Sequence, residues 1–197
     1  MLLVVKASNF TTMIFDAEVI EEIREGSLYL RKITKNDTKF LFNSLNNPYL
    51  ITYLSMNPIK TIEEAKRLIR RYSKYWENYA QYNYLIELRK PELIKIGAIS
   101  LWNINWRHLR AEIGIWISPS YWKRGYGKKS LSLIKTIGLN HLKLNRLEAH
   151  IAIENTNSIH LFKLCGFKEE GTLIQYLKIN NKFHDTLLLA YIKEDVS

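Results

Sequence analysis

The sequence predicts a mixed α/β domain, and three observations lead to this fold class. Apolar or alternating runs that are typical of strands are interspersed with segments of helical spacing. The clearest strand, residues 111–117, leads through a loop with two glycines into a helix at about residues 128–140. Near its end the chain has a hairpin pattern, with strands at residues 172–178 and 185–192 around a turn at residues 179–182.

The composition is that of an ordinary soluble globular protein. Of the 197 residues, 47% are hydrophobic and 24% are charged, and no apolar run approaches the roughly 20 residues that span a bilayer. The single cysteine, Cys165, excludes an internal disulfide and is typical of a reducing compartment. We therefore expect a cytoplasmic protein without a membrane partner. The formal net charge of +10 favours an anionic partner, such as a phosphate-bearing cofactor, an acidic polypeptide or RNA.

Residues 1–24 are predicted to form an appendage, because the first clear turn and strand come only after them. A single domain of residues 25–197 is expected to begin with a turn and a short strand at residues 28–33. Asn36-Asp37 can cap the helix that follows, and residues 49–56 are predicted to form a loop or a short helical turn.

The next helix begins with a capping box, in which Thr61 is the cap and Glu64 reaches back to it. Behind it, apolar residues recur every three or four positions, which is typical of an amphipathic helix. The other side of this helix carries five cations: Lys66, Arg67, Arg70, Arg71 and Lys74. We interpret this basic face as a solvated helix surface, with an acidic substrate or ribosomal RNA as the alternative partner.

Two further strands are predicted at residues 82–88 and 95–106, with a hairpin turn at residues 89–92. Another strand at residues 146–153 follows the helix that begins near residue 128. A last helix, capped by Asn155, precedes the closing hairpin. The sequence shows no metal-ligand cluster and no internal repeat.

The loop at residues 122–127 is the most informative stretch, because it joins a strand to the start of a helix. Gly125 and Gly127 let main-chain N–H groups approach a ligand closely, and the helix dipole adds partial positive charge there. Four cations crowd this helix end, where acidic residues are normally preferred: Lys123, Arg124, Lys128 and Lys129. The pattern predicts a phosphate-binding loop, with a simple turn in a lysine-rich chain as the alternative.

Two motifs resemble those of the GNAT superfamily of N-acetyltransferases. The loop is similar to the acetyl-coenzyme A signature of that superfamily, (Gln or Arg)-x-x-Gly-x-(Gly or Ala), and residues 155–167 resemble its closing Asn-x-x-Ser…Gly-Phe helix. Glu169-Glu170-Gly171 resembles the Rim-type branch, which acetylates the N-termini of ribosomal proteins. The resemblance covers about residues 28–192. It implies a predominantly antiparallel central sheet that is splayed between its fourth and fifth strands and flanked by helices on both faces.

The same resemblance implies acetyl-CoA as co-substrate and no metal. The pyrophosphate would lie on the glycine loop, and the pantetheine arm would extend along the strand before it. The residues that the resemblance assigns to cofactor binding are Ile115, Trp116, Ile117, Trp122, Lys123, Arg124, Gly125, Tyr126, Gly127, Lys128, Asn155 and Phe162. Trp122 departs from the expected Gln or Arg, and Lys123 stands where glycine is common. Neither change removes the main-chain donors.

The general base has two candidates, His150 and Glu112. Transfer to an amine needs the neutral form, and an α-amino group with a pKa of about 7.7–8.0 is partly neutral near pH 7. His150 stands where similar ribosomal alanine acetyltransferases carry a glutamate base, and an imidazole suits this task. Glu112 could act directly or through water. The structural alternatives are a hydrogen-bonded sheet histidine and a carboxylate paired with an arginine.

The general acid is less defined by the sequence. The tyrosine of the family's closing helix is Phe162 here, which has no hydroxyl, and Ser158 or Tyr126 could replace it. A thiol with a pKa of about 8.5 needs little help to leave, so water or the departing ammonium could supply the proton.

The acceptor is expected to be a primary amine, and the resemblance favours the N-terminal α-amino group of a ribosomal protein, with possible ribosome association. Five aromatic residues are candidates for acceptor binding, with core packing as their alternative role: Tyr53, Tyr75, Trp76, Trp106 and Tyr176. The alternative enzyme would acetylate a polyamine, an amino sugar or an antibiotic. The alternative outside enzymes is a non-catalytic ribosome- or RNA-binding module. We expect a monomer or a homodimer.

Overall fold

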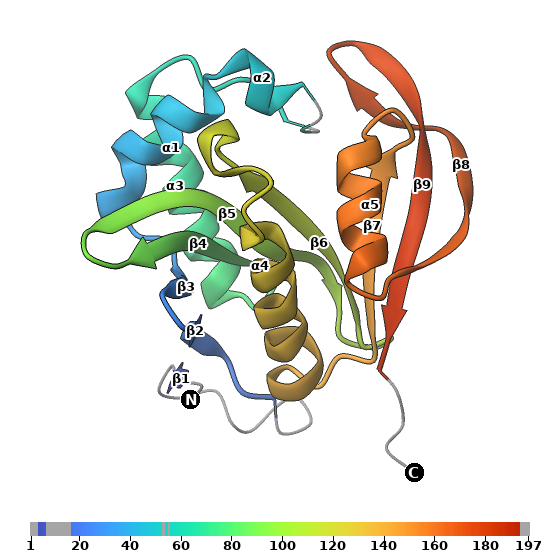
Figure 1. The fold of residues 1–197 in the computed structure, drawn as a ribbon, viewed down its shortest axis with the longest axis horizontal. Coiled ribbons are helices and arrows are strands. Elements are labelled where there is room, and N and C mark those ends of the chain that lie inside the picture. Colours follow the sequence, from blue (N-terminus) through green and yellow to red (C-terminus); the bar gives the residue numbers. More distant parts are fainter. Residues whose placement is uncertain (1–3, 7–16, 53, 55, 194–197) are drawn as a thin grey trace.

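One sheet of nine strands organises the chain, in the order β1-β2-β3-β4-β5-β6-β7-β9-β8 (Figure 1). The structure is a computed structural model that describes residues 4–6, 17–52, 54 and 56–193. Among the described strands, β6 and β7 form the one parallel pair. Helices cover both faces of the sheet (Figure 1), so the predicted mixed α/β class is confirmed.

The elements follow the predicted order. The strands are β1 (Val4–Lys6), β2 (Ile20–Glu25), β3 (Leu28–Lys32), β4 (Tyr82–Arg89), β5 (Leu93–Asn105), β6 (Arg110–Ile117), β7 (Arg146–Ala152), β8 (Lys168–Ile179) and β9 (Lys182–Ile192). The helices are α1 (Thr38–Leu45), α2 (Pro48–Ile51), α3 (Ile62–Glu77), α4 (Tyr126–Lys135) and α5 (Thr156–Leu164), and a π-helical segment (Thr136–His141) continues α4. No helix within the described ranges is both long and apolar enough to cross a membrane.

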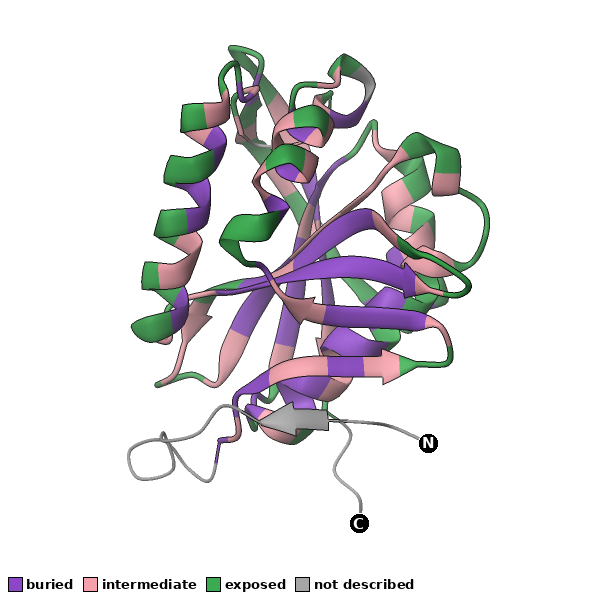
Figure 2. Ribbon diagram, turned by 90° about the vertical axis from the view of Figure 1, so that its left-hand side faces the viewer, coloured by how far each residue is buried: buried purple, intermediate pink, exposed green. Residues whose placement is uncertain are grey.

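The sheet separates two apolar cores. On one face, α4 buries the residues that the helical spacing predicted, since Leu131, Ile134 and Ile137 are fully inaccessible to solvent. On the other face, α1 and α3 pack against the central strands. Figure 2 shows that burial is concentrated in the central strands and in the inner sides of the helices. This arrangement is expected when amphipathic helices cover a sheet on both sides.

A buried ion-pair network holds α1 on the sheet. Asp37, which precedes α1 and is completely buried, accepts hydrogen bonds from Arg31 (2.9 Å) and forms an ion pair with Lys95 (2.6 Å). Burial disfavours the charged form of this carboxyl, but the bonds from Arg31 and Lys95 outweigh it and hold the pKa of Asp37 well below its usual range. The Arg31 guanidinium also binds the buried carboxylate of Glu87 on β4 (2.8 Å).

The sheet begins earlier in the chain than the predicted domain start at residue 25. Strand β2 pairs with β3, and it does so because Ile20 and Ile23 are completely buried in the core beneath α4. The N–H group of Glu18 also donates to the carbonyl of His141 at the end of the α4 segment (2.8 Å). Residues 17–24 of the predicted appendage therefore contribute to the packed domain.

The predicted splay lies between β6 and β7. These strands pair at three positions only, from Arg110 with Arg146 to Glu112 with Glu148. Beyond Glu112 no further pair joins the two strands in the described part of the chain, and they separate (Figure 1). They are the fourth and fifth strands counted from residue 28, so the predicted position of the splay is confirmed.

If β2 belongs to the cooperative fold, truncation of the buried Ile20 side chain should destabilise the whole domain. We expect Ile20→Ala to lower the free energy of unfolding by about 2–5 kcal/mol, the usual effect of such a core truncation. Glu21→Ala, which removes only a half-exposed ion pair with Lys32, should cost less than about 1 kcal/mol. Urea denaturation measures both, and a small, equal effect of the two substitutions would place β2 outside the cooperative unit.

Candidate active site

The edge of β6 that faces β7 is open beyond their last pair. On the opposite edge, the N–H group of Ser118 donates to the carbonyl of Ile96 on β5 (2.8 Å). Residues alternate between the two edges along a strand, so every second residue directs its main-chain groups into the splay. Those residues are Ile113, Ile115 and Ile117. The splay thus presents main-chain donors and acceptors to a ligand that adds as an extended strand.

The glycine loop brings further donors to the same opening. The first main-chain bond into α4 joins the N–H group of Lys129 to the carbonyl of Gly125 (3.2 Å). The N–H groups of Tyr126, Gly127 and Lys128 lie ahead of this bond, as at every helix start. Gly125 has a φ of 80°, in the left-handed region that glycine adopts without strain. The predicted loop geometry is therefore present.

The loop is also electrostatically suited to an anion. The first turn of α4 contains no acidic residue, and the side chains of Lys123, Arg124, Lys128 and Lys129 are exposed around it. Helix dipole, main-chain donors and cations all favour negative charge at this point. A diphosphate group fits these features.

Gly127 ties the loop to the far side of the splay. A Cβ atom at this position would come within 2.9 Å of the Leu161 side chain, so the missing side chain lets α4 approach α5 closely. Asn155 begins α5, and its side-chain oxygen accepts the N–H group of Ser158 (3.3 Å). The predicted cap is confirmed, and Ser158 lies half-buried in the first turn of this helix.

Trp122 connects the loop back to β6. Its indole Nε1 donates to the carbonyl of Ile117 (2.6 Å), while about half of the side chain remains exposed. Ile117 is one of the residues that face the splay. The tryptophan therefore borders the route of an extended ligand, at the position where the signature has Gln or Arg.

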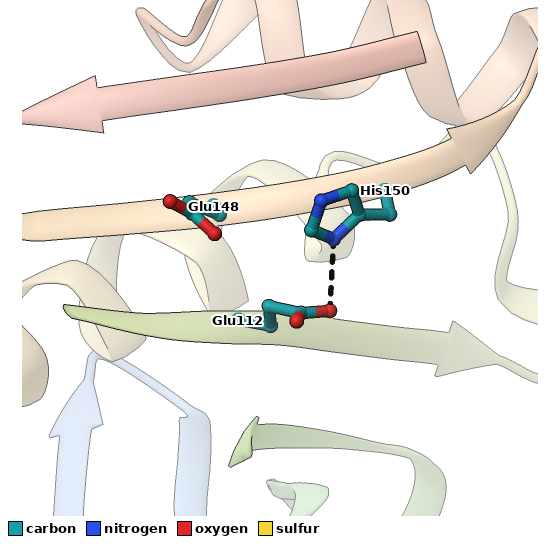
Figure 3. A group of neighbouring side chains, drawn as sticks. All are labelled: Glu112, Glu148 and His150. Carbon is teal, nitrogen blue, oxygen red and sulfur yellow. Dashed lines mark hydrogen bonds and ion pairs between the residues drawn. The ribbon is translucent and has the colours of Figure 1, made fainter. Parts of the chain in front are cut away.

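Glu112 and His150 meet across the splay. Oε2 of Glu112 lies 2.9 Å from Nδ1 of His150 (Figure 3). Oε1 of Glu112 accepts a hydrogen bond from Nδ2 of Asn103 (2.5 Å). Burial disfavours the charged carboxylate, but the bonds from His150 and Asn103 outweigh it and hold the pKa of Glu112 below its usual value. An ionised carboxylate only accepts, so Nδ1 carries the hydrogen and Nε2 is the proton-accepting atom of the imidazole.

Glu148 lies close to this pair but has other partners. One ligand atom each of Glu112, Glu148 and His150 falls within a group 4.8 Å across (Figure 3). The carboxylate of Glu148 forms ion pairs with Arg110 (3.1 Å) and Arg146 (2.6 Å). The charge of Glu148 is thus balanced by two arginines outside this group, while Glu112 pairs with His150 inside it.

Tyr176 on β8 completes the surroundings of the imidazole. Its ring stacks on His150, with centroids 5.0 Å apart and planes at 30°, and about half of the side chain is exposed. The closing hairpin therefore reaches the two candidates for the general base.

A cavity of about 210 Å³ lies on the α1 and α3 side of the sheet, and its lining includes Gly114, two residues along β6 from Glu112. Gly114 and Trp116, which share a strand face with Glu112, line its floor. Its walls include Leu54 and Met56 from the segment before α3, as well as Tyr72. Burial raises the pKa of Tyr72 to about 12, so this phenol is neutral at physiological pH.

Several predicted site residues lie elsewhere. Trp76 is buried in the core, where it packs edge-on against Tyr82, and Phe162 is buried against Phe167. Trp106 precedes β6 and therefore lies at the closed end of the splay, with its Nε1 bonded to the carbonyl of Tyr79 (2.9 Å). Trp76 and Phe162 are thus part of the core, and the partly buried Trp106 packs against it.

The remaining assignments are mixed. Tyr75 is partly exposed on α3 but does not line the cavity, and Tyr53 lies outside the described residues. Ile115, Trp116 and Ile117 are half-buried along β6, and Tyr126 is half-buried at the helix start. Sequence reasoning missed Asn103, whose positive φ of 49° marks an irregular point in β5. The residue type is the one sequence signal that could have indicated this position, because asparagine is enriched at positive φ angles.

Comparison with known proteins agrees with this geometry. The acetyltransferase (GNAT) domain family matches residues 27–168, so the chain belongs to this family. A similar protein is the spermidine N(1)-acetyltransferase of Vibrio cholerae, 30% identical over 160 residues that cover 81% of this chain and 90% of the relative. The crystal structure of the spermidine N-acetyltransferase from Vibrio cholerae with CoA and spermine has a TM-score of 0.76 at 27% identity, covering 85% of this chain and 96% of that one.

A Vibrio cholerae protein assigned as a ribosomal-protein-serine acetyltransferase shares the fold, with a TM-score of 0.74 at 21% identity over 87% of this chain and 97% of that one. The family match over residues 27–168 confirms the predicted superfamily. The protein is an acetyl-CoA-dependent N-acetyltransferase, and its acceptor is an amine.

Gly125→Ala should weaken acetyl-CoA binding, because a left-handed φ costs other residues about 1–2 kcal/mol and relaxation would displace the loop donors. We expect about a tenfold rise in the Kd, measured by calorimetry. Gly26→Ala is the matched control, since Gly26 also has a positive φ (62°) and open space around its Cα. Equal Kd values for all three proteins would contradict a role of the loop in binding.

Proposed function

We propose that the acceptor is the N-terminal α-amino group of a protein or peptide whose first side chain is uncharged. The observation that carries this proposal is the cavity near Glu112, whose lining includes no charged side chain among the residues that the structure describes. Apolar residues and the neutral groups of Tyr72, Gln81 and Ser100 surround it. Such a cavity suits a small uncharged side chain next to the reacting amine.

An amide donor in the cavity lining supports a peptide acceptor. Asn83 is buried, and its Oδ1 accepts a hydrogen bond from Nε2 of Gln81 (2.8 Å). Its Nδ2 has no hydrogen-bond partner among the described residues. A buried donor without a partner is costly, and a peptide carbonyl would satisfy it. A protonated polyamine has only donors and could not.

The charge of this region also favours a peptide over a polyamine. A polyamine carries several positive charges, which are normally matched by carboxylates. Residues 49–60, of which Leu54 and Met56 line the cavity, contain no Asp or Glu in their sequence, and the chain as a whole carries a net charge of +10. A peptide N-terminus brings at most one positive charge, and it is lost before the reaction.

In this proposal His150 is the general base and Glu112 positions it. The imidazole Nε2 takes the proton from the amine as the nitrogen attacks the thioester carbonyl, while the carboxylate holds the ring through Nδ1. Main-chain N–H groups on the open edge of β6 stabilise the oxyanion. The C–S bond then breaks, and the thiolate takes the proton that the His150 imidazolium now holds, directly or through water. Phe162 takes no part, because it lies in the core.

A polyamine acceptor is the second candidate. It is favoured by the named activity of the Vibrio cholerae relative, which is similar over most of its length. The two candidates differ in the number of charges and in the presence of a carbonyl group next to the reacting amine.

Acetylation of a peptide with an N-terminal alanine or serine should exceed that of spermidine and spermine by about tenfold or more in kcat/KM. Mass spectrometry of the products at saturating acetyl-CoA measures both classes in one assay. The same peptide with a blocked N-terminus and a free lysine is the control for site of transfer. A preference for spermidine would refute the peptide proposal and establish the second candidate.

Removal of the base should affect turnover and spare cofactor binding. We expect His150→Ala to lower kcat by about 10²–10⁴-fold, with little change in the Kd for acetyl-CoA. The exposed His160 on α5 offers a matched control, and His160→Ala should behave like the parent protein. Phe162→Tyr should change kcat less than His150→Ala or Glu112→Ala. A larger loss from the Phe162 change would overturn this ordering.

A further inference from the structure

A second, open groove of about 660 Å³ runs beside α3. Lys60 before the helix and Arg67 and Arg71 on it line this groove, together with Glu64. Arg67 and Arg71 are exposed and one helical turn apart, so they lie on the same side of α3. Part of the basic face noted in the sequence thus borders a groove.

The two acidic residues of this helix start are already engaged. The Glu64 carboxylate accepts the N–H group of Lys60 (2.7 Å), and Glu63 forms an ion pair with Lys66 (2.6 Å). The predicted reciprocal bond of the capping box therefore goes to Lys60 and not to Thr61. Within the described residues, neither Arg67 nor Arg71 forms an ion pair. The groove lining carries three cations against one carboxylate.

The groove adjoins the cavity near Glu112, because Met56 lines both. A peptide whose first residue lies in the cavity would exit the cavity next to the Met56 side chain. Each extended residue advances about 3.3 Å, so the groove lies within reach of the next few residues.

We propose that this groove binds acidic side chains that follow the N-terminus of the acceptor. The inference rests on the proposed peptide acceptor and adds a preference for sequence beyond the first residue. Arginine binds carboxylates through two parallel N–H groups, and two arginines one turn apart can engage acidic residues along an extended peptide. Ion pairs at an exposed rim raise the rate of association more than they alter the chemical step.

The test compares two peptides that share the first two residues and differ at positions three to six, where one carries Asp and Glu and the other Asn and Gln. For the parent protein we expect a KM about tenfold lower for the acidic peptide, as two exposed ion pairs of ordinary strength would give, and an unchanged kcat. Arg67→Gln with Arg71→Gln should abolish the difference. Arg70→Gln, at an exposed position outside the groove, should preserve it.

The outcomes separate this inference from the acceptor proposal. If both peptides are acetylated with equal KM, the groove does not bind acidic side chains, and the proposal of a peptide acceptor is unaffected. Failure to acetylate either peptide, with activity on spermidine, would refute the acceptor and the groove together. Loss of binding to a labelled RNA oligomer in the double variant, with unchanged peptide KM, would identify a nucleic-acid surface and overturn the inference.

Discussion

The early end of the pairing between β6 and β7 is the constraint on which the site depends. Past Glu112 and Glu148, each strand keeps its other neighbour: β6 stays paired with β5 to Ile117, and β7 with β9 to Ala152. Both strands therefore remain ordered although their facing edges no longer meet. Main-chain groups inside a protein are rarely left without partners, so such a gap is a position at which an extended ligand replaces the missing strand.

The hydrogen bond between Glu112 and His150 spans this gap at its narrow end. It joins the two halves of the sheet and fixes the orientation of the imidazole. Asn103 supports the carboxylate from β5, and Tyr176 covers the imidazole from β8. Four side chains from four strands thus converge at the proposed catalytic centre. Glu112 and His150 lie in regularly paired strands, which hold them more rigidly than loops would, whereas Asn103 and Tyr176 lie at irregular points of β5 and β8.

The sequence indicated the parts of this site better than their assembly. The glycine loop and Glu112 were recognisable because strand and helix periodicities are local, but the contact of Glu112 with His150 depends on the parallel register of β6 and β7. Periodicity marks a buried side of a helix without saying whether a core or a ligand covers it, which is why the sequence left both roles open for Trp76. Strand β2 was missed for a related reason: Ile20 and Ile23 are three apart and do not alternate.

The position of the Trp122 indole makes its fluorescence suitable for following ligand binding. It bonds to the carbonyl of Ile117 at the mouth of the open edge, with half of its surface in solvent. An acyl donor that adds along this edge must pass the ring, so it alters the polarity around the indole. Tryptophan emission responds to such changes, and the enzyme consequently carries an intrinsic optical reporter at the entrance of its own binding cleft.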